Sequence, residues 1–209
     1  MKLAASQVKG PNRMSPGRET TAQADPPASD AELAVAFRRD PQLFTAVYDR
    51  YAADVYGYVA GRLDRASAED VTADTFCVAF DQRHRFDPER GALRPWLFGI
   101  ATNLVARHRR REARHYAALA RAGCDPAMDS HEGRVVASVA AQRLQPRLAR
   151  ALAALSPGER DVLLLVALGQ LSHQEVAEAL GISYGTVGSR LSRARAKVHG
   201  AFDQEDLDG

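Results

Sequence analysis

Apolar residues recur at helical spacing through most of the chain between residues 30 and 203. The spacing i, i+3, i+4, i+7 of an amphipathic helix predicts helices at residues 30–38, 41–59, 67–80 and 92–114, and then at about 143–155 and 157–168. A last pair of helix-length segments fills residues 171–198. No segment has the alternating pattern of a β-strand. The pattern therefore predicts an all-α protein.

Residues that favour helix starts precede several of these segments. We expect Asp30 to cap the first helix, and Asp40 followed by Pro41 to open the second. Ser67 is placed to start the third. Ser156 is placed to cap the helix at residues 157–168, because an oxygen-bearing side chain can accept a backbone N–H of the first turn.

The final pair of segments has the signals of a helix-turn-helix. Ser172 and Glu175 form a capping-box pattern at the start of the first helix. Gly181 is suited to the left-handed stop of that helix, and Ser183 can cap the next one. Two capped helices joined by a short turn that contains Gly are typical of this DNA-binding motif.

The second helix of this pair divides its residues between an apolar stripe and a basic, hydroxyl-bearing face. At about 100° per residue, the inward stripe consists of Val187, Leu191, Ala194 and Val198. Opposite it lie Ser189, Ser192, Arg193 and Ala196, with Arg190 and Arg195 on the flanks. Such a face suits the major groove, where Arg reads guanine edges and flanking cations meet phosphates. The alternative is a solvated amphipathic helix that binds nothing.

The predicted helix at residues 92–114 contains a second basic segment. It combines the aromatic stretch RPWLFGIATNL with the basic stretch VARHRRREAR. The cations of this segment are Arg94, Arg107, Arg109, Arg110, Arg111 and Arg114, with His108 among them. Cations beside rings are what single-stranded DNA requires, because cations follow phosphates and rings receive unstacked bases. The alternative is a core helix with a solvated basic end, and Trp96 is expected in the core.

Charge is segregated along the chain, although the net charge of the 209 residues is only +2. Acids outnumber bases between residues 19 and 81, whereas Glu112 is the only acid between residues 90 and 121. Such segregation indicates one surface for nucleic acid and another for a protein partner. Cys77 and Cys124 lack the spacing of a metal site or a disulfide framework, which fits a reducing cytoplasm. Cys77 is expected in the core.

These patterns predict two small helical domains, at residues 30–116 and 140–203, joined by a flexible linker at 117–139. Residues 1–29 are expected to be disordered, with Met14 as a second possible translation start, and residues 204–209 form an acidic tail. The sequence has no signal peptide and no apolar run long enough to span a membrane. We therefore expect a cytoplasmic protein without membrane insertion.

Three stretches resemble regions two and four of the extracytoplasmic-function (ECF) sigma factors. They are AEDVTADTFCVAF, RFDPERGALRPWLFGIATNLVARHRRR and LSPGERDVLLLVALGQLSHQEVAEALGISYGTVGSRLSRARAKV, and the resemblance covers about residues 30–202. It implies a first domain that docks on the β′ clamp coiled coil of the RNA polymerase core and melts the minus-ten promoter element. It implies a second domain that contacts the β flap and reads the minus-thirty-five element. An anti-sigma factor is expected to hold such a protein inactive.

The resemblance also implies roles for individual residues. The core-binding helix is matched by Asp70, Asp74, Thr75 and Phe76. The minus-ten segment is matched by Arg94, Trp96, Asn103, Arg109, Arg110 and Arg111. The recognition helix is matched by Thr186, Ser189, Arg190, Ser192 and Arg193. The helical period, rather than the resemblance, makes Lys197 on the flank a further expected phosphate anchor. This chain departs from the family pattern at Ala73, Arg107 and Gly188, and the last of these removes a frequent cation.

Two other classes of function compete with this interpretation. A helix-turn-helix regulator would need a ligand-sensing or dimerising first domain, and residues 30–114 show no phosphoacceptor pattern. A nuclease or recombinase would need clustered carboxylates or a positioned nucleophile. Asp70 and Asp74 lack a third ligand, and His108 and His115 lack Cys or carboxylate partners at ligand spacing. We therefore expect no catalytic residues, no metal and no cofactor.

Overall fold

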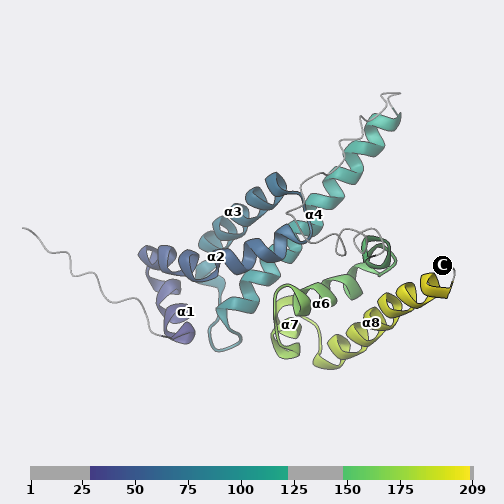
Figure 1. Ribbon diagram of the computed structural model, residues 1–209. Helices are drawn as coiled ribbons and strands as arrows, with labels where there is room; N and C mark the ends of the chain where they lie inside the picture. Colours follow the sequence, from purple (N-terminus) through teal and green to yellow (C-terminus); the bar gives the residue numbers. More distant parts are fainter. Residues whose placement is uncertain (1–28, 122–147, 208–209) are drawn as a thin grey trace, which may run out of the picture.

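The computed structural model describes residues 29–121 and 148–207, and every regular element in these two ranges is a helix. The predicted all-α class is confirmed. The N-terminal half, residues 29–121, and the C-terminal half, residues 148–207, pack side by side, with the end of α4 projecting from the body (Figure 1). The expected disordered N-terminus and most of the expected linker lie outside the described residues.

The N-terminal half contains α1 (Asp30–Arg39), α2 (Phe44–Ala60), α3 (Arg65–Gln82) and α4 (Leu93–Arg121), with short 3-10 turns at Pro41–Leu43 and Arg83–Arg85. Two predicted caps were wrong by one to three residues. Ser29 caps α1 in a full capping box with Glu32, and Asp64 caps α3 by accepting the Ser67 N–H. In both places a neighbouring oxygen-bearing side chain takes the cap, as the same chemistry allows. The Asp40 cap is confirmed.

The C-terminal half contains a helical segment at residues 148–153, followed by α6 (Pro157–Ala167), α7 (His173–Leu180) and α8 (Tyr184–Leu207). Ser156 and Ser172 form the predicted caps, each with a Glu three residues later. Gly181 takes the left-handed conformation, with φ of 62°, and Ser183 Oγ accepts the Thr186 N–H. The helix-turn-helix prediction is therefore confirmed in its local detail.

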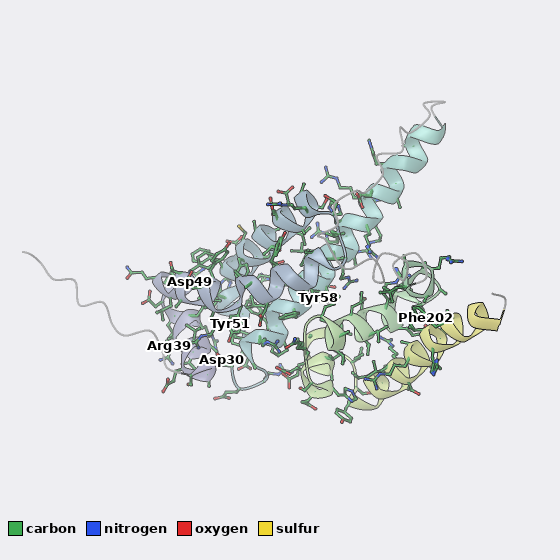
Figure 2. The ribbon with its side chains drawn as sticks, in the orientation of Figure 1. Asp30, Arg39, Asp49, Tyr51, Tyr58 and Phe202 are labelled. Carbon is green, nitrogen blue, oxygen red and sulfur yellow. The ribbon has the colours of Figure 1, made fainter. Side chains whose placement is uncertain are left out.

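The hydrophobic core is continuous across both halves rather than split into two. It runs from Leu33 and Phe37 on α1 through Val55 and Phe98 to Leu191 on α8. Full burial of a side chain such as Leu or Phe contributes about 1.5–3 kcal/mol, so the shared part of this core favours the packed arrangement. Tyr51 and Tyr58 line α2 within the N-terminal half (Figure 2), and the Tyr58 hydroxyl hydrogen-bonds Thr102 Oγ1 on α4 at 2.8 Å.

The two halves approach so closely that glycine is required at the boundary. A Cβ added at Gly99 on α4 would lie 2.5 Å from the Ala179 carbonyl oxygen of α7. A Cβ at Gly61 would lie 2.4 Å from Leu168 Cδ1. Real Cβ atoms do not come this close to other heavy atoms, so backbone packing of α4 on α7 depends on the missing side chain of Gly99.

Helix lengths and one burial prediction differ from the sequence-based expectations. The helix α4 continues to Arg121, beyond the expected domain end at residue 116, and α8 continues through Leu207. Cys77 is exposed, so its expected place in the core was wrong. It follows the buried Phe76 on α3, and one step of about 100° moves a side chain from the core to the surface.

Candidate nucleic-acid interface

The acidic face of α3 consists of two exposed carboxylates one helical turn apart, Asp70 and Asp74. Thr75 and Phe76, which the family motif groups with them, are fully buried. Thr75 Oγ1 donates to the Val71 carbonyl at 2.7 Å, and the Phe76 ring packs against the Tyr48 ring at a centroid distance of 4.9 Å. Of the four predicted residues, only the two acids are therefore presented to a partner. Thr75 and Phe76 contribute to this surface only by packing in the core beneath it.

A groove lined by arginines runs between α1 and the loop that precedes α4. Its larger part, about 820 Å³, is lined by Arg38, Arg39, Arg85 and Arg90 together with Val35, Asp87, Pro88 and Glu89. Arg39 is labelled in Figure 2. Sequence reasoning missed this groove because its cations come from two segments about fifty residues apart, and no local pattern joins them. Four guanidinium groups around one hollow suit a phosphate backbone.

The groove continues into a second pocket, about 270 Å³, that shares Arg85, Asp87 and Arg90 with the first. This second pocket is lined by Trp96 on α4 and, from the C-terminal half, by Glu178 on α7. Trp96 is half-buried, and its ring packs on Phe86 at a centroid distance of 4.9 Å. The expected place of Trp96 fully in the core was therefore wrong: the ring packs against the core from its edge, and its exposed part lines the second pocket.

Arg94 spans the boundary between the halves. Its Nη2 donates to the Gly169 carbonyl at 2.7 Å and its Nη1 to the Gln170 carbonyl at 3.4 Å. Glu175 of α7 and Asp54 of α2 each place a carboxylate oxygen 3.6 Å from the guanidinium group. The predicted minus-ten residue is therefore held by the turn before α7 and by carboxylates from both halves.

The remaining predicted residues of α4 fall into two groups. Asn103, Arg110 and Arg111 are exposed, as a nucleic-acid contact requires. Arg109 is half-buried and donates from Nη2 to the Arg62 carbonyl at 2.7 Å. Burial, followed by the nearby charge of Arg62, lowers the pKa of Arg109. Arg109 thus supports the loop after α2, whereas the other three residues face solvent.

On α8, the faces predicted from the helical period are confirmed. Val187, Leu191 and Ala194 are buried, and Val198 is half-buried at the end of the stripe. Ser189, Ser192 and Arg193 are exposed, while Thr186 and Arg190 are half-buried. The Thr186 hydroxyl hydrogen-bonds Ser183 Oγ at 2.8 Å, and Ser189 Oγ donates to the Thr186 carbonyl at 3.1 Å.

Glu159 links α6 to two cations of α8. Its carboxylate lies 2.7 Å from Lys197 Nζ and 3.5 Å from Arg193 Nε, and its side chain is only 7% exposed. The hydrogen bond from Lys197, then the one from the Ser156 backbone, lowers the pKa of Glu159 from 4.5 to about 2. The sequence indicated Glu159 only as a capping residue, because its second role depends on packing between α6 and α8.

An ion pair between a buried arginine and a half-buried aspartate also joins the halves. Arg62, which follows α2, donates from Nη2 to Asp161 Oδ1 on α6 at 2.5 Å, and its side chain is 3% exposed. Arg62 also donates to the Tyr58 hydroxyl. Removing one partner of a buried pair costs about 3–5 kcal/mol, because the other charge stays desolvated. No sequence signal could connect residues separated by 99 positions.

Asp64, His108 and Glu112 bring their ligand-type atoms within 4.8 Å of one another. The expectation that His108 lacks carboxylate partners was therefore wrong: its Nε2 lies 3.5 Å from Glu112 Oε1, one turn along α4. Zn²⁺ accepts such ligands, but Glu112 also interacts electrostatically with Arg109, and a cation there disfavours a metal ion. We interpret the cluster as polar side chains of α4 packed against the start of α3.

Comparison with known proteins identifies the fold. The model of Sigma-70 region 2 matches residues 47–115, and that of Sigma-70 region 4 matches residues 146–198. The RNA polymerase sigma factor NccH of Alcaligenes xylosoxydans xylosoxydans is 30% identical over 181 residues, which cover 83% of this chain and 94% of NccH. The chain belongs to the ECF sigma factors.

Two solved sigma-factor structures are similar to this sigma factor. CnrH in complex with the cytosolic domain of CnrY has a TM-score of 0.59 and 27% identity, and the match covers 84% of this chain and 97% of CnrH. The sigma factor RpoE of Bartonella quintana, in complex with the anti-sigma factor NepR, has a TM-score of 0.55 and 26% identity over 77% of this chain and 96% of RpoE.

Sigma factors are non-enzymatic proteins of transcription initiation, and this role applies to the present chain as a member of the family. Across residues 29–121 and 148–207, no helix has the length and apolar character needed to cross a bilayer. The N-terminal half corresponds to region 2 and the C-terminal half to region 4, and these names are used below.

Proposed function

We propose that this sigma factor binds the RNA polymerase core in the cytoplasm and directs initiation by reading two promoter elements. Region 4 reads the minus-thirty-five duplex through α8, and region 2 receives the melted minus-ten strand along α4. The observation that carries the proposal is the exposed face of α8. Ser189, Ser192 and Arg193 are presented to solvent while Val187 and Leu191 anchor the same helix in the core.

The shape of α8 supports insertion into a major groove. The helix starts at Tyr184 with a side-chain cap, and Tyr184 and Gly185 in its first turn are exposed, which suits the helix start that reads base edges in helix-turn-helix proteins. Thr186 and Arg190 flank the outward face and are placed to meet phosphates. Lys197 already donates one hydrogen bond to Glu159 and shares its charge with that carboxylate, so we assign it a smaller share of binding.

The groove of region 2 supports single-strand binding. Its arginines can follow the phosphates from Arg38 to Arg90, and Trp96 lies at the far end, where an unstacked base could be received. The exposed Arg110 and Arg111 extend the basic surface along α4. Base–aromatic stacking combined with a cationic path is the arrangement that binds single strands.

The protein partners are proposed from the same surfaces. Asp70 and Asp74 present negative charge suited to a basic coiled-coil surface, which fits docking of α3 on the β′ clamp coiled coil, while region 4 meets the β flap. The RpoE relative was solved with an anti-sigma factor. A protein of that class is the proposed inhibitor here, and it would cover the core-binding and DNA-binding faces.

The test is transcription by purified core polymerase from a library of genomic fragments. Core with this sigma factor should start transcripts at defined positions that share two upstream elements, whereas core alone should not. A matched preparation with Arg193→Ala should shift the upstream element while leaving the minus-ten element unchanged.

A two-domain helix-turn-helix regulator is the competing function. A regulator would bind duplex DNA but could not direct initiation by bare core polymerase. Specific duplex binding without any core-dependent start would therefore reject the sigma-factor mechanism in favour of a regulator.

A further inference from the structure

The first turn of α6 contacts three cations of α8, at positions 190, 193 and 197, whose spacing places them along one side of that helix. Glu159 Oε2 accepts a hydrogen bond from Lys197 Nζ at 2.7 Å, and Glu159 Oε1 lies 3.5 Å from Arg193 Nε. A Cβ added to Gly158 would lie 2.9 Å from Arg190 Nη1, so the Arg190 guanidinium group fills the space that a side chain there would take. The helix α6, which lies beside α8 in Figure 1, therefore sets the places of cations that the proposed function assigns to DNA.

The position of Glu159 is fixed within α6. The Ser156 N–H donates to Glu159 Oε2 at 3.0 Å, and the Glu159 N–H donates to Ser156 Oγ at 3.4 Å, which completes a capping box. The Glu159 side chain is 7% exposed, and its lowered pKa keeps it charged at neutral pH. The cap and Lys197 share Oε2, whereas Oε1 faces Arg193. Arg193 thus meets a charged carboxylate whose place does not depend on α8.

This carboxylate faces one edge of the Arg193 guanidinium group, at Nε. Arginine has five N–H donors, and four of them belong to Nη1 and Nη2. These terminal nitrogens make the bidentate hydrogen bonds by which arginine reads the O6 and N7 atoms of guanine in the major groove. Because the Arg193 side chain remains 62% exposed, anchoring Nε orients the side chain and leaves the base-reading nitrogens available.

We propose that Glu159 is a positioning residue for promoter recognition, which holds Nε of Arg193 and thereby presents Nη1 and Nη2 to one base pair of the minus-thirty-five duplex. The inference rests on the proposed reading of that duplex by α8. It assigns part of the base specificity to a side chain of α6, which lies outside the helix-turn-helix and touches no DNA. The same carboxylate offsets the charge of Lys197 and so limits binding that does not depend on sequence.

These two effects of Glu159 have opposite signs for the two kinds of binding. Orienting one long side chain in advance changes affinity about two- to tenfold, because the side chain then loses less freedom on binding. This gain applies where Arg193 makes its base contact, so it contributes to discrimination. Neutralising Glu159 should therefore weaken discrimination. It should also release the charge of Lys197 to the phosphates, which strengthens binding to all sequences and steepens its log–log salt dependence by up to about 0.9.

Glu159→Gln is the main test. A capping box accepts Glu or Gln at this position, so the variant keeps the cap of α6 while it loses the charge that faces α8. Glu32→Gln is the matched control, because Glu32 occupies the same position of the capping box of α1, in region 2. Thermal unfolding followed by circular dichroism sets a temperature at which both variants are folded.

Each variant is combined with core polymerase, and binding to promoters that differ at single base pairs of the minus-thirty-five element is measured by competition at two salt concentrations. We expect Glu159→Gln to lower discrimination about two- to tenfold, at the base pair where Arg193→Ala lowers it. It should also bind mismatched elements more tightly than the wild type, and Glu32→Gln should do neither. Unchanged discrimination in Glu159→Gln, or an equal loss of affinity for all elements, would overturn the inference.

Two double variants test whether Glu159 acts through Arg193. In the Arg193→Ala background, Glu159→Gln should lower discrimination no further, because the side chain that it positions is absent. In the Lys197→Ala background, Glu159→Gln should still lower discrimination, because the release of Lys197 is not the cause of that loss. A further loss in the first background, or full discrimination in the second, would contradict the positioning role.

The same measurements separate this inference from the proposed function. A base preference that survives Arg193→Ala unchanged rejects the proposed reading by Arg193, and the positioning role with it. A base preference that is lost in Arg193→Ala but retained in Glu159→Gln rejects only the positioning role and leaves the proposed function standing.

Discussion

The two arginine-bearing helices α4 and α8 hold their cations in different ways. On α4, Arg94 is held by carbonyl and carboxylate groups from the other half of the molecule. On α8, Arg193 and Lys197 are held by Glu159, which belongs to the same half. Separation of the halves therefore changes the environment of α4 and leaves that of α8 intact.

This difference indicates two modes of DNA binding in one chain. In the proposed function, the duplex-reading face of region 4 has its cations oriented by contacts within the same half. The proposed strand-binding face of region 2 instead has Arg94 oriented by groups of region 4.

The largest expected effect concerns the proposed core-binding face of α3, which lies outside both arginine-bearing helices. Asp70→Ala combined with Asp74→Ala removes the exposed acids of α3, and loss of an interface charge pair costs about 2–5 kcal/mol. Affinity for core polymerase, measured by titration, should fall accordingly, while duplex binding by α8 should not change. Glu69→Ala, which removes another exposed acid from the same helix, is the control. Unchanged core affinity of the double variant would move the docking site away from α3.

The next effect tests whether α8 reads bases. Arg193 is 62% exposed on the face opposite the buried stripe, so Arg193→Ala should remove about 1–3 kcal/mol of discrimination at one base pair. The measurement is binding to a library of upstream duplexes, with Arg195→Ala on the flank as the control. A uniform loss of affinity, with base preference retained, would show that α8 is not inserted in the major groove in this orientation.

A smaller effect compares two cations of α8 through salt. Arg195 is exposed, and losing one phosphate contact lowers the log–log dependence of affinity on salt by about 0.9. Lys197→Ala should lower this slope less than Arg195→Ala does, because Lys197 Nζ is already hydrogen-bonded to Glu159. Both variants should weaken all sequences alike. A larger slope change for Lys197→Ala would show that the contact with Glu159 does not limit the phosphate contact of Lys197.

Local features of this fold were predictable from sequence because their causes are local. The Ser172 capping box, the left-handed Gly181 and the buried stripe of α8 each depend on residues within two helical turns. The predicted caps of α1 and α3 lie one and three residues from the observed caps, because several oxygen-bearing side chains compete for each cap position. Residue types decided these features, and tertiary packing only selected among near neighbours.

Features that depend on the packing of distant helices were not predictable. The family motif grouped Thr75 and Phe76 with Asp70 and Asp74, but only the structure shows that the first two are buried. The Arg62–Asp161 pair joins segments with no sequence relation, and the two-domain pattern gave no sign that the halves share a core. The sequence grouped the predicted site residues of α4 without their intramolecular partners, and their role in binding DNA stays a prediction.

The smallest expected effect concerns the contact between Glu159 of α6 and Lys197 of α8 and its dependence on pH. The pKa of Glu159 is lowered from 4.5 to about 2, so the folded protein keeps this carboxylate charged where the unfolded chain would protonate it. The stabilisation is complete above about pH 4.5 and is lost as the pH falls toward about 2. Glu159→Gln should therefore lower the urea midpoint most at neutral pH, and its difference from wild type should shrink between about pH 4.5 and pH 2.

Lys197→Met should move the pKa of Glu159, followed by NMR of its carboxyl carbon, back toward 4.5, because the hydrogen bond from Lys197 is the largest cause of the shift. A Glu159 titration that is unaffected by Lys197→Met would show that the Lys197 contact does not hold α8 on α6, and the contrast with α4 would no longer rest on it.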